Sequence, residues 1–264
     1  MLQLSSVFAN AGTLCQIRTR FGTMEVELYD EDKPVTVANF KRYVQSGSWT
    51  NMFIQRWETG FVIQAGGFYV SDLGTASAII NQVSVFGTIT NEYSVGRTFS
   101  NTYGTLAMAL AASDTNSGTS QWFVNLTNNS FLDASSFTVF GRVVRGTNVL
   151  QRFNNTSATN GITVYSGLGG ALSELPVTVN PPNYADLIYL DLSLLSVNVA
   201  TNATGGHVVS WNSVSNKVQR VEFTTNSPPN WQLLSSTNGN GLRLSVTDTN
   251  KSTPLLFYRV RVDY

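Results

Sequence analysis

Hydrophobic and polar positions alternate with a period of two through most of this chain, in short runs that turn residues interrupt. Residues 14–29 alternate on both sides of a Phe21-Gly22-Thr23 turn, which predicts a β-hairpin. Residues 68–103 are rich in Gly, Ser and Thr, and predict loops around one short strand at 86–90. Further strands are predicted at residues 52–67 (two strands joined at Glu58-Thr59-Gly60), 105–111, 121–126, 137–144 and 185–195.

Two segments have the helical period instead. Pro34 is suited to the first position of a helix, and Val37, Phe40 and Val44 follow at helical spacing before Gly47 ends the segment. A short second helix is predicted at residues 147–153, with Val149, Leu150 and Phe153 on its apolar face. Many short strands with two helices predict a closed, mainly β barrel whose ends the helices cover.

A second domain is predicted at the C-terminus. Asn, Thr and Gly concentrate near residues 196–206, so we expect a boundary there, with domains at 1–196 and 197–264. The later part resembles the fibronectin-III-like domains that end secreted bacterial proteins, which implies a small β-sandwich. Its five alternating runs are residues 208–211, 218–224, 231–234, 242–246 and 257–262.

Composition limits the partners and the location. The net charge is zero and only 12% of residues are charged, which argues against an electrostatic grip on nucleic acid or an anionic membrane. No apolar run approaches the ~18 residues of a membrane span. A polar but weakly charged surface is common in exported proteins, so we expect a periplasmic or extracellular location, with the cytoplasm as the alternative. Because the first residues lack the features of a signal peptide, an exported chain would be a trimmed form.

The residues that carry chemistry lie mainly in segments 53–66 and 104–123. These segments place the polar side chains of Arg56, Gln64 and Gln121 among Phe and Met residues, which predicts a shallow apolar pocket with a few fixed hydrogen-bonding groups. Neither segment offers a nucleophile–base pair, paired acids or metal ligands. One cysteine (Cys15) and one histidine (His207) cannot supply a disulfide, a metal site or a catalytic triad. Such a pocket suits chemistry in which no covalent bond is made or broken.

Five stretches, in order, resemble the cyclophilin family of peptidyl-prolyl isomerases over residues 14 to 196. The resemblance implies an eight-stranded antiparallel barrel with two helices, peptidyl-prolyl cis-trans isomerase (rotamase) activity on proline-containing polypeptides, a role in protein folding, and no cofactor or metal. The stretches are Gly22–Tyr29, Pro34–Phe40, Arg56–Gly66, Gly104–Phe123, and Leu132-Asp133 with Phe140-Gly141-Arg142-Val143-Val144.

The resemblance also implies roles for single residues. Arg56, Phe61 and Gln64 correspond to catalytic positions. Simple alternation along a strand puts Phe61 on the face opposite to Val62 and Gln64, so a local bend is required for all three to line one site. Positions that contact substrate are Val62, Ala109, Leu110, Gln121, Phe123, Phe131, Leu132 and Phe137.

Three of these positions depart from the family pattern. Leu110 stands where Asn is common, Phe131 where Trp is common, and Phe137 where many members have His. Leu110 removes a polar contact to substrate backbone, and Phe131 removes an indole donor, so we expect weak cyclosporin binding. Two alternatives therefore stay open: a proline-binding module with little or no turnover, and a surface-attachment protein whose C-terminal domain is the functional part.

Overall fold

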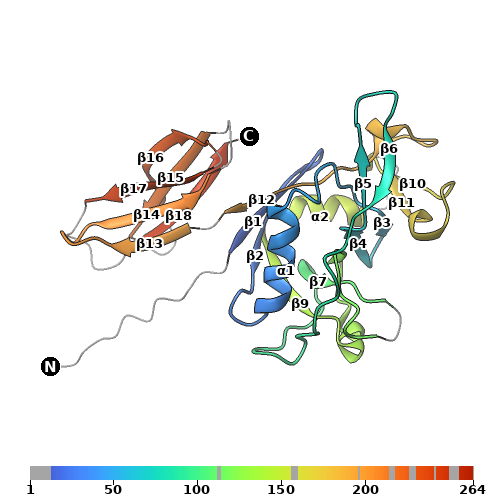
Figure 1. Cartoon of the computed structure of the whole chain (residues 1–264), viewed down its shortest axis with the longest axis horizontal. Helices are drawn as coiled ribbons and strands as arrows, with labels where there is room; N and C mark the ends of the chain where they lie inside the picture. The colour runs from blue at the N-terminus through green and yellow to red at the C-terminus, as the bar shows by residue number, and fades with distance from the viewer. Residues whose placement is uncertain are drawn as a thin grey trace. The chain divides into compact units, whose positions relative to one another are not determined.

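A computed structural model of the chain describes residues 13–111, 114–155, 160–195, 197–213, 218–225, 230–240, 242–249 and 256–263 (Figure 1). Its contacts divide it into two compact units, Met1–Leu192 and Ser193–Tyr264. This division falls four residues before the boundary expected at 196, a position outside the described residues, so the exact domain limits stay a prediction.

The first unit is built on one eight-stranded sheet. From β1 (Leu14–Thr19) to β3 (Arg56–Glu58) in the sheet order, neighbouring strands are all antiparallel. The two edges of the sheet are joined through the segments that precede the two edge strands. The Ile54 N–H donates to the carbonyl of Ile188 at 2.9 Å, and the Leu190 N–H donates to that of Met52 at 2.8 Å. The predicted eight-stranded, mainly β cyclophilin-like architecture is confirmed. In sheet order the strands are β12 (Asp191–Leu195), β1 (Leu14–Thr19), β2 (Gly22–Leu28), β9 (Val139–Arg145), β7 (Thr105–Met108), β8 (Trp122–Asn125), β4 (Val62–Ala65) and β3 (Arg56–Glu58).

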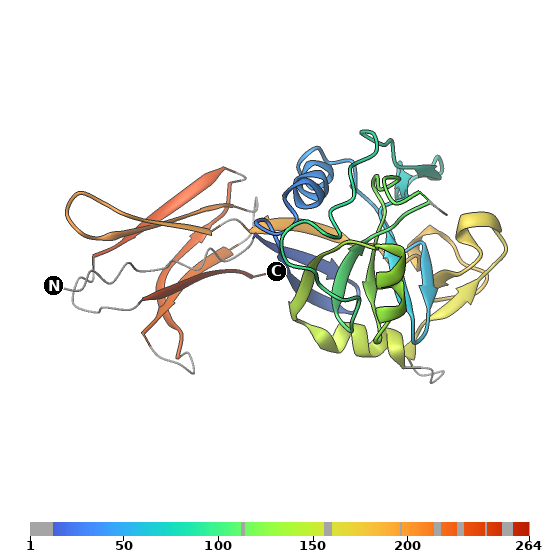
Figure 2. The same cartoon turned by 90° about the horizontal axis from the view of Figure 1, so that it is seen from below.

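Two helices lie on opposite sides of this sheet, as Figure 2 shows. Helix α1 (Pro34–Gln45) begins at the predicted proline and buries Val37 and Phe40. Helix α2 (Thr147–Asn154) buries Val149, Leu150 and Phe153, the apolar face that the sequence predicts. Both predicted helices are therefore present, and no helix among the described residues is long and apolar enough to cross a membrane.

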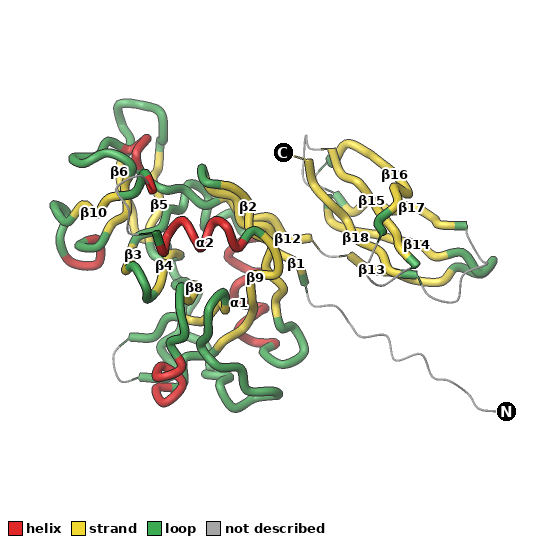
Figure 3. Tube along the Cα trace, turned by 180° about the vertical axis from the view of Figure 1, so that it is seen from behind, coloured by secondary structure: helices red, strands yellow, loops and turns green. Residues whose placement is uncertain are grey.

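The prediction for residues 68–103 is wrong in part. The segment begins with a hairpin of β5 (Phe68–Ser71) and β6 (Ile79–Gln82), and residues 86–90 form no strand but a single bridge between Ile89 and Gly118. The Gly, Ser and Thr residues that suggested a loop supply the turn between β5 and β6, visible among the strands in Figure 3. A second hairpin, β10 (Thr163–Tyr165) with β11 (Leu175–Val177), shares a core with the first.

The second unit consists of two three-stranded sheets. Val209 and Trp211 from one sheet pack against Val221 and Val260 from the other, so the unit has a core of its own. All five alternating runs are strands, and the expected linker contains a sixth, because residues 197–201 pair with β14 (His207–Asn212). The likeness to fibronectin-III domains stays a prediction. The sheets are β13 (Val197–Thr201), β14 (His207–Asn212), β17 (Arg243–Asp248), and β16 (Gln232–Asn238), β15 (Val218–Thr224), β18 (Phe257–Asp263).

Candidate functional site

A pocket of about 160 Å³ opens on the first unit where the β3–β4 hairpin meets the ends of β7 and β8. Nine of the eleven residues singled out from the sequence line it. The remaining two, Gln121 and Phe131, lie outside the lining and contact residues that belong to it. The lining residues are Arg56, Phe61, Val62, Gln64, Ala109, Leu110, Phe123, Leu132 and Phe137.

The β3–β4 hairpin resolves the alternation problem at Phe61. Arg56 and Gln64 are direct partners across the two strands, so their side chains lie on the same face. Phe61 belongs to the turn rather than to β4: its N–H donates to the Glu58 carbonyl at 3.0 Å, and Gly60 supplies a φ of +72°. Alternation does not apply to a turn residue. Phe61, Val62 and Gln64 all line the pocket, and the turn is the bend that the sequence analysis required.

Arg56 lies at the mouth of the pocket with its guanidinium carbon 5.5 Å from the centre of the Phe61 ring. Its side chain is one third exposed, at 33%. Its Nε donates to the Glu174 carboxylate, and its Nη2 donates to the Glu58 carboxylate at 2.8 Å. Of the five guanidinium N–H groups, three have no hydrogen-bond partner among the described residues and can serve a ligand.

Three glutamine side chains support the polar side of the pocket. The Gln121 Oε1 accepts hydrogen bonds from Gln64 Nε2 and Gln55 Nε2, both at 2.8 Å. The Gln55 Oε1 accepts in turn from the Gly67 N–H at 2.7 Å. Gln121 thus fixes Gln64 from behind, and buried Gln55, for which sequence reasoning found no role, completes the chain of contacts.

Aromatic and aliphatic side chains form the opposite wall. Phe123 on β8 meets Phe137 edge to face, with ring centres 5.7 Å apart at 74°. Val62 and Phe123 are almost fully buried, and Leu132 and Phe137 pack against them from the following segment. A wall of this kind can bind a small apolar ring through packing contacts alone.

Phe131, like Gln121, lies outside the pocket lining. Its side chain is 65% exposed, and its ring stacks on Phe61 at 5.9 Å between centres and 17° between planes. Phe131 therefore extends the apolar surface outward from the pocket mouth, where it can reach a ligand longer than one residue.

The short helix η1 (Ser130–Ser135), which carries Phe131 and Leu132, is anchored by the Asp133 carboxylate. Asp133 Oδ1 accepts from the Asn101 N–H at 2.9 Å and from Asn101 Nδ2 at 2.8 Å, and Oδ2 accepts from the Ser100 hydroxyl. Burial raises the pKa of the Asp133 carboxyl, but these hydrogen bonds outweigh it and hold the pKa below its usual value. The Asn101 anchor gives no signal in the sequence because it lies 32 residues from Asp133.

The curled eight-stranded sheet with this pocket defines a cyclophilin-like barrel. The sequence pattern of the family described as cyclophilin type peptidyl-prolyl cis-trans isomerase/CLD matches residues 14–166, more than half of the chain, and the chain belongs to that family.

Two proteins of similar sequence are named peptidyl-prolyl cis-trans isomerases. A peptidyl-prolyl cis-trans isomerase of Acinetobacter baylyi is 36% identical over 156 residues, which cover 58% of this chain and 77% of the relative. Peptidyl-prolyl cis-trans isomerase B of Escherichia coli is 32% identical over 53% of this chain and 82% of its own length. A solved cyclophilin-type isomerase of Cryptosporidium parvum, crystallised in the presence of the dipeptide Ala-Pro, has a TM-score of 0.49 and 21% identity over 69% of this chain and 99% of its own.

Proposed function

We propose that the first unit catalyses cis–trans isomerisation of X-Pro peptide bonds in polypeptides that bind at its pocket. The observation that carries this proposal is the position of the Arg56 guanidinium, at the mouth of an apolar pocket and with donors to spare. The family assignment and the names of the relatives support the same activity.

The chemistry follows from amide resonance. Rotation about the C–N bond destroys that resonance and meets a barrier of about 18–20 kcal/mol, so unaided isomerisation takes roughly 10–100 s. In the twisted state the prolyl nitrogen becomes pyramidal and its lone pair becomes a hydrogen-bond acceptor. A donor that favours this state over the planar one lowers the barrier, because only interactions stronger in the transition state accelerate a reaction.

Arg56 suits this task for two reasons. A guanidinium keeps its proton at any physiological pH, and it offers several N–H groups in one plane. The surrounding Phe61 and Phe123 exclude water from one side, which strengthens a hydrogen bond to a developing lone pair. The wall of Phe123, Leu132 and Phe137 would hold the pyrrolidine ring while the chain that precedes it rotates.

A second function, a proline-binding module with little turnover, is favoured by one observation. Leu110 lines the pocket with an aliphatic side chain where the family commonly offers a polar contact to substrate backbone. Loss of such a contact lowers peptide affinity and weakens the hold on the chain that must stay fixed during rotation. Arg56 itself is unaffected by this departure, which is why isomerisation is the preferred function.

A protease-coupled assay on an Ala-Pro peptide tests the proposal. We expect measurable activity in the wild type and a loss of at least about tenfold in kcat/KM in Arg56→Ala, or about 1.4 kcal/mol of transition-state stabilisation. Arg142→Ala is the matched control, since Arg142 also pairs with a carboxylate on the same sheet but does not line the pocket. Equal activity of wild type and Arg56→Ala would refute the role of Arg56, and inactivity of both would favour the binding module.

The wider role that we propose is assistance to protein folding in an exported compartment. The weakly charged composition supports the location, and X-Pro isomerisation is slow enough to limit folding. Accelerated refolding of a proline-limited client by this protein, together with its recovery from the periplasmic or culture fraction, would support the role. Exclusive recovery from the cytoplasm would contradict the location.

A further inference from the structure

Two carboxylates share the guanidinium at the pocket mouth. Glu58 and Glu174, here called the acidic rim, both bond to Arg56, and their side chains are 48% and 41% exposed. One cation with two anions leaves a net charge of −1 beside the pocket, in a chain whose overall charge is zero. Because the acidic rim is exposed, its field reaches a ligand that extends out of the pocket.

Glu174 reaches this position from a segment outside the residues that match the family pattern, which end at 166. It lies between the short helix η3 (Gly170–Leu172) and β11, and its backbone carbonyl accepts from the Trp57 N–H at 2.9 Å. That bond holds the backbone of Glu174 beside β3, and the Glu174 carboxylate therefore lies next to Arg56. The acidic rim therefore combines Glu58, which lies within the residues that match the family pattern, with Glu174, which lies beyond them.

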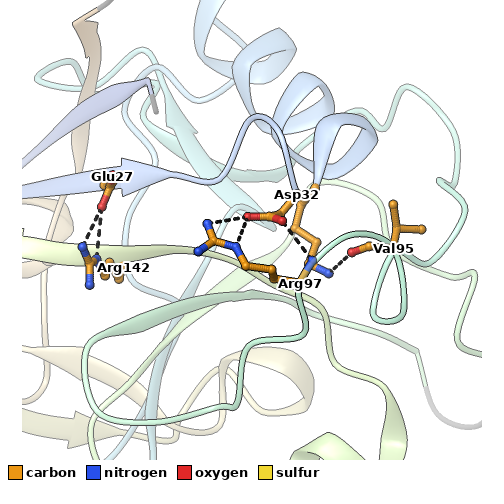
Figure 4. Close-up of polar contacts among 6 residues, drawn as sticks. Glu27, Asp32, Val95, Arg97 and Arg142 are labelled. Carbon is orange, nitrogen blue, oxygen red and sulfur yellow. Dashed lines mark hydrogen bonds and ion pairs between the residues drawn. The ribbon is translucent and has the colours of Figure 1, made fainter. Parts of the chain in front are cut away.

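Two arginines of the described part of the first unit have carboxylate partners of their own that balance their charge. Figure 4 shows that Arg142 is paired with Glu27 and Arg97 with Asp32, one carboxylate to each arginine. The Arg97 hydrogen bonds hold the pKa of Asp32 below its usual value, so that pair stays neutral as a unit. The Lys33 amine donates to backbone carbonyls that include that of Val95 at 2.5 Å, and the Glu92 carboxylate lies close enough to interact with its charge.

The anchor of η1 adds to the imbalance. Asp133 follows the lining residue Leu132, and the donors on its carboxylate are a hydroxyl, an amide side chain and a backbone N–H, all of them neutral. Carboxylates therefore flank the pocket from both the β3–β4 hairpin and η1, whereas Arg56 is the only cation among its described lining residues.

We propose that the acidic rim selects substrates: prolyl segments with a Lys or Arg side chain close to the proline are preferred over segments with Asp or Glu there. The proposal rests on the function proposed above and names the substrate class of the same site. Exposed charges act through water, so the effect is modest, about three- to tenfold between a Lys and a Glu peptide at low salt. It shrinks at high salt, because added ions shorten the Debye length below the roughly 10 Å that holds at 0.1 M.

The test compares two acetylated peptides, Lys-Ala-Pro-Phe and Glu-Ala-Pro-Phe, on the full chain. Kd is measured by calorimetry, and exchange between cis and trans by NMR, which avoids the sequence preference of a coupling protease. The test variant is Glu58→Gln with Glu174→Gln, which keeps the size and acceptor oxygen of each side chain. The matched control is Glu25→Gln with an equal change of charge per residue, since Glu25 pairs with Arg145 on β2 and β9 away from the pocket lining.

We expect the Lys peptide to be favoured about three- to tenfold by the wild type and by Glu25→Gln, and by less than about twofold in the double variant. Equal Kd and equal turnover for the two peptides in the wild type would overturn the proposal, as would an undiminished preference in the double variant. If neither peptide is isomerised, a Kd preference that disappears in the double variant still supports charge selection and refutes the isomerase instead.

Discussion

The anchor of η1 offers a prediction that links one carboxylate to the shape of the pocket. Asp133→Asn removes the charge that accepts two hydrogen bonds from Asn101 and one from Ser100. The amide that replaces it keeps one acceptor oxygen and turns an NH₂ group toward donors. We therefore expect η1 to loosen, and with it Leu132, which lines the pocket.

The magnitude follows from the hydrogen bonds. A hydrogen bond to a charged group contributes about 1.5–3 kcal/mol when buried, and the partial exposure of Asp133 places the loss of the whole set at about 2 kcal/mol. For a unit of this size, that corresponds to a fall in Tm of roughly 4–8 °C. KM for an Ala-Pro peptide should rise because the wall is less well fixed, whereas kcat should change little because Arg56 is held by other residues.

The pH dependence provides an independent signature. The folded pKa of Asp133 lies below its unfolded value of about 3.9, so its contribution to stability is present above about pH 4 and is lost as the pH falls through the folded pKa. Wild type should therefore lose more stability between pH 5 and about pH 2.5 than Asp133→Asn does. Thermal unfolding followed by circular dichroism across this range measures both effects. An unchanged Tm at pH 7 and parallel acid curves for the two proteins would refute the assigned role of Asp133.

Three further predictions concern other parts of the chain. Phe131→Trp should raise cyclosporin affinity about five- to a hundred-fold by supplying a donor worth about 1–3 kcal/mol, with peptide turnover within a few-fold; unchanged affinity in calorimetry would show that position 131 does not meet the drug. A chain of residues 1–196 should fold and keep full activity on short peptides. Insolubility or lost activity would contradict the domain boundary and show that the first domain needs the C-terminal unit to fold. Gly66→Ala should lower the free energy of unfolding by at least about 1–3 kcal/mol, because Gly66 has a φ of +92° and an added Cβ would lie 2.2 Å from the Ser120 carbonyl oxygen; a Tm equal to wild type would contradict this.

The fold could be predicted from the sequence where one period dominates a segment. The alternation at 14–29 and the helical spacing after Pro34 both correspond to elements of the structure: β2 buries every second residue from Met24 to Leu28, and α1 buries Val37 and Phe40 on one face. A strand is predicted at 86–90, but this segment pairs with other described residues only through the single bridge between Ile89 and Gly118. Pairing depends on what lies beside a segment in space, and a local pattern does not contain that information.

The same difference between local pattern and spatial neighbours applies to the candidate site. Arg56, Phe61 and Gln64 could be found together because nine sequence positions span them and the family spacing is local. Glu174 could not, since 118 residues separate it from the Arg56 that it contacts. Its backbone is placed by a bond to β3, and only the folded chain shows that bond.

The central claim, that the pocket isomerises X-Pro bonds with Arg56 as the essential donor, is tested most directly by watching the exchange itself. NMR exchange spectroscopy on an Ala-Pro peptide gives the rate of cis–trans interconversion in the presence of protein, beside the Kd of the same peptide. Wild type should interconvert the isomers far faster than the spontaneous process, which takes roughly 10–100 s. Arg56→Ala should be at least about tenfold slower, with a Kd within a few-fold of wild type. Equal exchange rates in the two proteins at equal occupancy, or a wild-type rate no faster than the spontaneous one, would contradict the claim.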